Sequence, residues 1–207
     1  MKKIYSILLG AALMLIGSQA YAQLAVGAGY LNATDKSSAG NHSTSFDRNG
    51  FYAGATYGLD LSSITEGLGF EPGAALNFVF GKTEADVTDA NHLDIALQIP
   101  LNFKYTYELD GDLKVFGLAG PALQLGLIKR DKWTTGGDTT TRDYYSDNGL
   151  DLSRFNVLLG LGVGVEFGEK FQIRFGYDFG LLPLYNENDM KYTRPGQLKF
   201  GVAYLLF

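Results

Sequence analysis

The stretch LDIALQIPLNFKYTYEL, residues 93–109, alternates from end to end between two kinds of side chain. Every odd position from Leu93 to Leu109 is apolar, and the even positions carry Asp, Ala, Gln, Pro, Asn, Lys, Thr and Glu. A period of two predicts a β-strand, because successive side chains of a strand point to opposite faces. The run is far longer than the usual strand of about five or six residues, and a strand of roughly 9 to 11 residues already crosses a bilayer at a tilt.

Residues 1–22 have the pattern of a secretory signal peptide. A basic start at Lys2 and Lys3 precedes an apolar stretch, and Ala20-Tyr21-Ala22 supplies the small residues of a cleavage site. We therefore expect a signal peptide over residues 1–22 and one outer-membrane β-barrel domain over residues 23–207. No later run reaches 18 apolar residues, so the sequence excludes a helical membrane protein.

The composition excludes several classes of function. The formal net charge is −5 and falls to −7 once Lys2 and Lys3 are removed, which argues against nucleic acid as a partner. The chain contains no cysteine, so it has neither disulfides nor thiolate metal sites. The segment from Asp147 to Asp151 lacks the carboxylate spacing of a calcium loop. The sequence predicts no metal and no cofactor.

The alternation of residues 93–109 occurs in eight segments along the chain. An even number of antiparallel strands can close into a barrel without an exposed edge. We therefore predict an all-β fold, an eight-stranded antiparallel transmembrane β-barrel of the outer-membrane type. A soluble β-sandwich with an aromatic core is the alternative, but it does not account for the longest strands. The predicted strands are 24–30, 50–61, 68–80, 93–109, 113–128, 154–167, 171–181 and 198–207.

The connections between these strands alternate between short and long, and this predicts the orientation of the barrel. The short connections are 62–67, 110–112 and 168–170, and the long ones are 31–49, 81–91, 129–153 and 182–197. Outer-membrane barrels have short periplasmic turns and longer extracellular loops. We therefore expect a bacterial outer-membrane location, with the short turns and both termini in the periplasm and the long loops outside the cell.

Two sets of side chains follow from the alternation. Outward aromatic residues gather near both ends of the strands, as in the interfacial girdles of membrane proteins. They are Tyr30, Phe51, Tyr57, Phe70, Phe78, Tyr105, Tyr107, Phe155, Phe167, Phe171, Tyr177, Phe179 and Tyr204. Inward charges of both signs predict a filled, ion-paired lumen, because eight strands leave room only for side chains. They are Asp60, Glu71, Asp94, Lys104, Glu108, Lys114, Arg154, Glu166, Arg174, Asp178 and Lys199.

An alternative reading applies to four of the inward charges, which lie near strand ends. Asp60, Asp94, Glu108 and Arg154 fit equally well in solvated vestibules at the two mouths of the barrel.

Four segments resemble a known family. Residues 93–105, with Ile99-Pro100-Leu101 at their centre, resemble a strand of the PorT-like outer-membrane β-barrel proteins, small barrels of the OmpX and OmpA type. Residues 117–126 are similar to the strand that follows it there, and residues 159–166 and 177–181 to the sixth and seventh strands. The resemblance implies a small barrel in the outer membrane of a Gram-negative bacterium, surrounded by outer-membrane lipid and inserted by the outer-membrane assembly machinery.

Two irregularities interrupt the pattern. Phe207 ends the chain, as in such barrels, but the outward residues before it lie in the opposite phase, so either a bulge near Leu205 restores the phase or Phe207 falls past the last paired residue. Pro72, Pro100 and Pro121 lack an N–H for the ladder, and we expect bulges or missing bonds there.

The function that the sequence favours is structural or interactive, with no enzymatic activity. Trp133, Arg142, Tyr144 and Tyr145 in the third long loop have the composition of a binding surface for an envelope or extracellular protein. The alternative, which the sequence favours, is a mobile polar loop whose Tyr and Trp side chains rest on the barrel rim. The alternatives are an accessory barrel of a protein secretion system, a small-solute pore and a lipid-modifying enzyme. An enzyme would need His42 and a neighbouring loop serine, which a serine-rich loop offers by chance.

Overall fold

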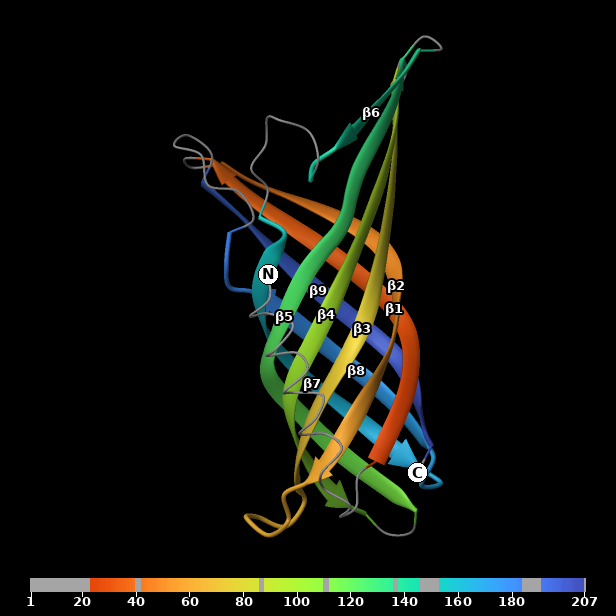
Figure 1. Ribbon diagram of the computed structural model, residues 1–207, viewed down its shortest axis with the longest axis vertical. Helices are drawn as coiled ribbons and strands as arrows, with labels where there is room; N and C mark the ends of the chain where they lie inside the picture. The colour runs from red at the N-terminus through yellow and green to blue at the C-terminus, as the bar shows by residue number, and fades with distance from the viewer. Residues whose placement is uncertain are drawn as a thin grey trace, which may run out of the picture.

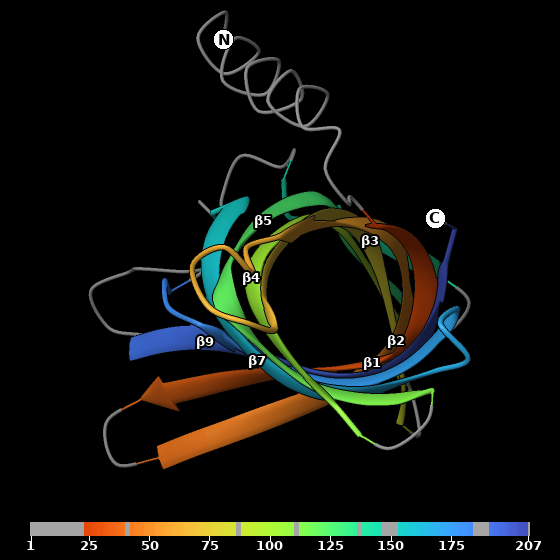
Figure 2. The same cartoon turned by 90° about the horizontal axis from the view of Figure 1, so that it is seen from below.

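The computed structural model describes residues 23–39, 42–85, 88–109, 112–135, 138–145, 153–183 and 191–206, and these residues form an all-β barrel. Figure 1 shows the strands inclined to the long axis, and Figure 2 shows them closing around a lumen. The predicted signal peptide and Phe207 lie outside the described residues. No helix among the described residues is long and apolar enough to traverse a membrane.

The described residues contain nine strands. Their bounds are β1 Gln23–Ala39, β2 His42–Asp60, β3 Leu68–Ala85, β4 Thr88–Glu108, β5 Leu113–Thr135, β6 Asp138–Asp143, β7 Phe155–Phe167, β8 Phe171–Gly180 and β9 Lys191–Leu205.

Within the described part of the chain, eight of these strands form the barrel wall, and every pairing is antiparallel. The order is β4-β3-β2-β1-β9-β8-β7-β5, and the pairing of β4 with β5 closes the ring. The short connections 61–67 and 168–170 and the two ends of the described chain lie at the same end, where Ala25 pairs with Leu205. We call this the turn end and the opposite one the hairpin end. The predicted fold is confirmed.

The strands are longer than predicted at the hairpin end. Three of the four expected long loops are largely β-hairpins, because β1 pairs with β2, β3 with β4 and β5 with β6 almost to their tips. The period of two that marks the barrel wall does not extend into these hairpins.

Beyond the barrel wall the extensions separate into two arms. Pairing between β2 and β3 stops at Asn49 and Phe80. The first arm comprises residues 191–195 of β9, 32–39 of β1 and 42–48 of β2. The second arm comprises residues 81–85 of β3, 88–93 of β4, 128–135 of β5 and β6. In Figure 1 the second arm rises highest while the first leans away from it, and Figure 2 shows the first arm projecting sideways from the barrel.

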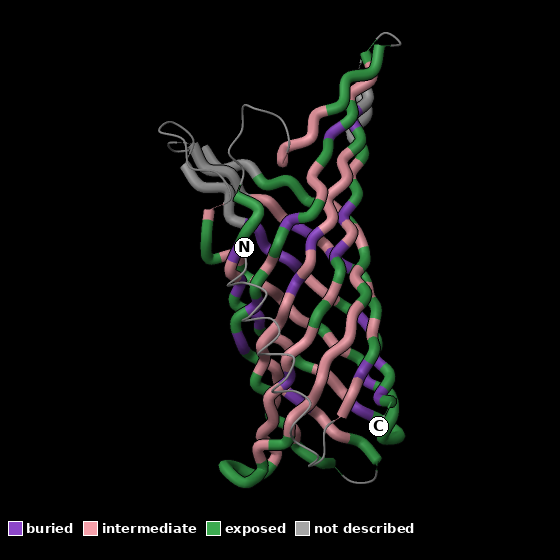
Figure 3. The backbone as a smooth tube through the Cα atoms, in the orientation of Figure 1, coloured by how far each residue is buried: buried purple, intermediate pink, exposed green. Residues whose placement is uncertain are grey.

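The outer wall is apolar and the inner face is polar or small, as the alternation predicts. Exposed outward residues include Phe103, Val163 and Val202, at 52%, 60% and 58% exposure, which is the expected surface of a wall in contact with lipid. Buried or intermediate residues alternate with exposed ones along much of the wall, as Figure 3 shows. The interior is packed with small apolar side chains such as Ala25 and Ala203 together with buried amides and carboxylates.

Neither of the two predicted irregularities contains a bulge, and the gap beside Pro72 is the other expected outcome, missing bonds. The β1–β9 register runs unchanged through Leu205, so the bulge proposed there is absent, and Leu205 is the last residue of β9. The prolines interrupt pairing without shifting it, since the register between β3 and β4 is the same before and after the gap that follows Pro72. A bulge does occur in β5. Ile95 pairs with Ile128 but Ala96 pairs with Gly126, so Leu127 is an extra residue.

Candidate functional site

The lumen at the turn end is filled by an ion-paired group, which we call the Arg174 cluster. Arg174 contacts Glu71 through two hydrogen bonds, Nη1 to Oε1 at 2.5 Å and Nη2 to Oε2 at 3.1 Å. Its Nε donates to Gln172 at 2.9 Å, and Gln172 in turn donates to Glu166 at 2.7 Å. Lys104 pairs with Glu166 at 3.5 Å. Strands on opposite walls of the barrel are therefore linked through its centre.

Phe116 packs against both cations of this cluster. The Lys104 Nζ lies 4.4 Å from the ring centroid and the Arg174 Cζ 5.7 Å, which are cation–π distances. Phe116 is 4% exposed, and a side chain on Gly164 would overlap its ring. The sequence interpretation missed this residue, because it treated the inward face as polar and small.

A second group, the Lys199 cluster, crosses the middle of the barrel. The Lys199 Nζ lies 2.8 Å from Asp178 and donates to Gln98 at 2.6 Å, while the Gln98 Nε2 donates to Asp178 at 2.8 Å. Asn77 donates to Gln98 at 2.8 Å and to Gln197 at 3.2 Å. The three amide side chains are almost fully buried. The sequence pattern places Asn77 and Gln98 on the polar phase and Gln197 in a long connection, and it predicts no role for them in the network.

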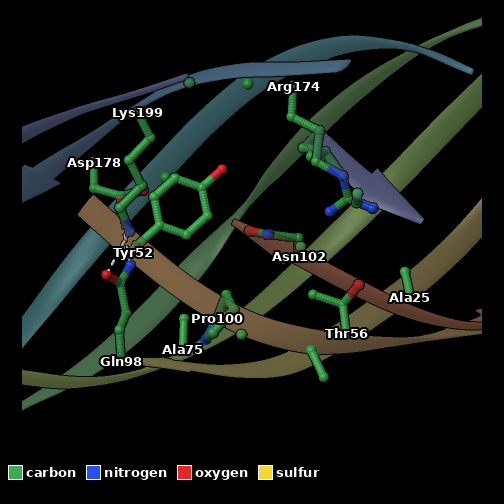
Figure 4. A pocket seen from close by; sticks show the side chains of 18 of the residues that line it. Ala25, Tyr52, Thr56, Ala75, Gln98, Pro100, Asn102, Arg174, Asp178 and Lys199 are labelled. Carbon is green, nitrogen blue, oxygen red and sulfur yellow. Dashed lines mark hydrogen bonds and ion pairs between the residues drawn. The ribbon is translucent and has the colours of Figure 1, made fainter. Parts of the chain in front are cut away.

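A chamber of about 140 Å³ separates the two clusters. Figure 4 shows Arg174 on one side of it and Lys199 with Asp178 on the other, with Tyr52 beside Lys199 and Asn102 between the two sides. A space of this size holds on the order of ten water molecules. The lumen therefore contains a chamber large enough for water between two polar layers.

A third group, the Arg48 cluster, lies toward the hairpin end. Arg48 pairs with Asp35, and Lys129 lies 3.8 Å from Asp35 and 3.7 Å from Asp94. Of these residues only Asp94 was predicted in the lumen. Asp35 and Arg48 fell in an expected loop. Lys129 faces inward because the extra residue Leu127 reverses the phase of β5. The sequence pattern does not predict this reversal.

The barrel mouth at the hairpin end is covered by two tyrosines. The Tyr144 hydroxyl donates to Asp131 at 2.5 Å, and His92 contacts the same carboxylate at 2.5 Å. Burial, followed by the hydrogen bond to Asp131, raises the pKa of Tyr144 to about 12. Tyr145 lies against Gly126, where a side chain would overlap its hydroxyl.

Arg154 holds Tyr145 in this position. It donates to the Tyr145 carbonyl oxygen at 2.7 Å, and its Cζ lies 4.8 Å from the Tyr145 ring. Burial raises the pKa of Tyr145. The predicted loop binding surface is therefore divided. Tyr144 and Tyr145 close the mouth, whereas Trp133 lies on β5 opposite Thr140 of β6, and Arg142 stacks 5.5 Å from the Tyr144 ring.

Four charges predicted for the lumen network lie outside its three clusters. Asp60 accepts hydrogen bonds from the Ser62 amide and hydroxyl, both at 2.8 Å, because the chain turns directly after it. Glu108 and Lys114 pair at 2.9 Å near the turn end, where Glu108 is 73% exposed. They lie at a vestibule of about 520 Å³ that opens on solvent. Arg154 contacts Tyr145 at the mouth.

The predicted girdle residues gather in aromatic contacts on the outer wall. Toward the hairpin end Phe51 stacks on Phe78 at 4.8 Å, and Tyr177 packs on Phe179 at 4.5 Å. At the turn end Phe171 lies 5.8 Å from Phe167 and 5.2 Å from Tyr204. Phe70 packs on Phe103, which was not among the predicted residues. The remaining predicted residues are Tyr30, Tyr57, Tyr105, Tyr107 and Phe155, which are exposed or half-buried.

The chemistry available in this site is hydrogen bonding and charge pairing. Among the described residues no group of three or more His, Asp or Glu side chains could hold a metal ion. His92 is bound to Asp131, and the side chain of His42 lies outside the described residues. The described lumen thus forms a series of paired layers.

Comparison with known proteins gives the family. The family model for the outer membrane protein beta-barrel domain matches residues 8–204. No curated protein matches the sequence. Among solved structures, the attachment invasion locus protein Ail of Yersinia pestis is 13% identical with a TM-score of 0.44, covering 89% of this chain and 99% of that one.

Two further structures are similar. Neisserial surface protein A is 20% identical with a TM-score of 0.40, covering 89% of this chain and 98% of that one. The N-terminal barrel domain of Pseudomonas aeruginosa OprF is 14% identical with a TM-score of 0.36, covering 90% and 100%. The family match spans nearly the whole chain, and the chain therefore belongs to the outer membrane protein beta-barrel domain family and is a protein of the outer membrane.

Proposed function

We propose that this protein is a closed barrel that binds another protein through the second arm. Three layers of paired charges and amides occupy the lumen, so the bore offers no continuous path for a solute. The arms, in contrast, extend the wall beyond the ring. The hairpin end faces the outside of the cell in this proposal, and the two tyrosines of the mouth keep the lumen shut on that side.

The observation that carries the proposal is the outer edge of β6. This strand is the last of its sheet and pairs only with β5. The Tyr144 amide donates to Lys129 of β5, and N–H direction alternates along a strand, so the amides of Arg142 and Thr140 also point to β5. The amides of Thr141 and Thr139 then point away from it. Such an edge is a template for an added strand.

The partner that fits this edge is a protein segment in extended conformation. Main-chain hydrogen bonds provide affinity in strand addition, and side chains beside the edge select the sequence. The exposed threonines 139–141 have high β-propensity and carry no charge that would oppose pairing. The likeness of Ile99-Pro100-Leu101 to PorT-like barrels supports a partner in the envelope, such as a component of a secretion system.

In-cell photo-crosslinking tests the proposal. A photoreactive residue at Thr139 is expected to give one discrete protein adduct, because that residue lies on the free edge. Thr141→Pro removes an outward N–H while leaving the pairing with β5, and it is expected to abolish the adduct. Thr141→Ala loses the same hydroxyl but keeps the N–H, and the adduct is expected to remain. Equal adducts in both variants would refute binding at this edge.

We propose neither a pore nor an enzyme. A closed lumen predicts no steady single-channel steps in a planar bilayer, and large steps would contradict it. His42→Ala is expected to leave the lipid A of the host unchanged, because a base needs a nucleophile and an orienting group within hydrogen-bond reach.

A further inference from the structure

A small cavity of about 40 Å³ lies in the lumen between the Lys199 cluster and the covered mouth. Asn77 and Gln197 line it on the side of the Lys199 cluster, Arg48 and Lys129 line its wall, and Tyr145 lines it on the side of the mouth. It is the smallest of the hollows described in the lumen and the most enclosed by protein.

Three residues that line this cavity carry an unpaired polar atom. Within the described part of the chain, three buried side-chain atoms have no hydrogen-bond partner, namely Arg48 Nε, Asn77 Oδ1 and Asn156 Nδ2. All three residues line this one cavity. Asn77 and Asn156 are each 1% exposed, so bulk water does not reach them. Buried polar groups without partners are costly, so this arrangement indicates an occupant that supplies the missing hydrogen bonds.

The charges around the cavity define the kind of occupant. The charged side chains lining it are Arg48, Lys129, Arg154, Asp35 and Asp94, which carry three positive and two negative charges. A monovalent anion would neutralise the remaining positive charge. It would also accept hydrogen bonds from Arg48 Nε and Asn156 Nδ2, whereas a cation would meet two donors and a net positive wall.

We propose that this cavity binds a single small inorganic anion of the halide class. Its volume corresponds to about three water molecules, which suits one halide ion together with a water that donates to Asn77 Oδ1. The bound ion links β2 to β7, two strands that do not pair, and so fastens the barrel at the height where the arms begin.

Anomalous diffraction from the purified barrel, crystallised in sodium bromide, tests this proposal directly. Bromide is the probe because it scatters anomalously and resembles chloride in size. The expected result is an anomalous peak in the cavity within hydrogen-bond distance of Arg48 Nε and Asn156 Nδ2. Water density in the cavity without an anomalous peak would overturn the proposal.

A matched pair of variants identifies the residues responsible. Asn156→Asp replaces a donor with a negative charge at nearly the same volume, and it is expected to lower bromide occupancy at least about tenfold. Asn102→Asp places the same charge in the chamber below the Lys199 cluster, and the peak is expected to remain. A peak of equal height in Asn156→Asp would refute the assignment.

A solution measurement applies even if the Asn156 variant does not fold. The unfolding midpoint of the unmodified barrel is expected to rise with bromide relative to gluconate at equal ionic strength, because gluconate is too large for the cavity. Identical midpoints in the two salts at every concentration would contradict specific binding.

Discussion

Removing the carboxylate of Glu71 is expected to lower the free energy of unfolding by about 3 to 5 kcal/mol. The Glu71 and Arg174 side chains are 5% and 16% exposed, and two hydrogen bonds join them. Glu71→Leu therefore leaves a buried guanidinium without its main counter-charge. Urea unfolding of the barrel in phospholipid vesicles, followed by circular dichroism, measures the loss.

A double-mutant cycle separates the charge pair from simple packing. Arg174→Met alone strands the Glu71 carboxylate and carries a similar cost of about 3 to 5 kcal/mol. The double variant has no unpaired charge, and its main loss is the unpaired Gln172 amide, about 1 to 3 kcal/mol. The coupling free energy is then at least about 3 kcal/mol. A double variant that loses the sum of the two single effects would refute the reasoning.

Three further predictions follow from the described contacts. A methyl group on Gly50 would overlap a backbone carbonyl of β3, so Gly50→Ala is expected to lower the free energy of unfolding by about 1 to 3 kcal/mol in the urea titration. Gly117→Ala is the control, because the nearest atom to its new methyl group is 4.0 Å away, and it is expected to change the free energy of unfolding little. Replacing both Gln98 and Lys199 by Ala removes only the middle layer, so planar-bilayer recordings are expected to show no conductance steps, because the Arg174 and Arg48 clusters remain. Burial and the hydrogen bond to Asp131 raise the pKa of Tyr144 from 10.0 to about 12. The neutral hydroxyl therefore stabilises the fold fully below pH 10, and this contribution disappears as the pH rises through about 12. The difference in urea midpoint between the unmodified protein and Tyr144→Phe is expected to vanish over that interval.

The barrel wall could be predicted because lipid on one side and a packed lumen on the other impose a period of two. Each predicted strand corresponds to a wall strand in the structure. The arms could not be predicted in this way, since their sequences lack the apolar alternation of the wall. Residues 32–39 and 129–135 therefore looked like loops although they pair along their length.

The lumen was predictable in charge and less so in detail. Glu71, Arg174, Asp178 and Lys199 lie on the inward phase, and the structure brings them into contact with partners from other strands. Phe116 was missed because an aromatic ring on a polar phase gives no signal of its own. Asp60 does not join the network, because the amide and hydroxyl of Ser62 in the following turn donate hydrogen bonds to its carboxylate. The alternation of side chains along a strand does not predict this local hydrogen bond.

The extra residue Leu127 has a consequence for anyone who grafts a hairpin onto this barrel. Upstream of it the inward positions of β5 are even-numbered, and downstream they are odd-numbered. A grafted segment that begins before Leu127 must therefore place its inward side chains at even positions, and one that begins after Leu127 must place them at odd positions. Deleting Leu127 would remove the bulge and leave Lys129 opposite Asp94 and Asp131 opposite His92, so the two faces of the arm would keep their orientation.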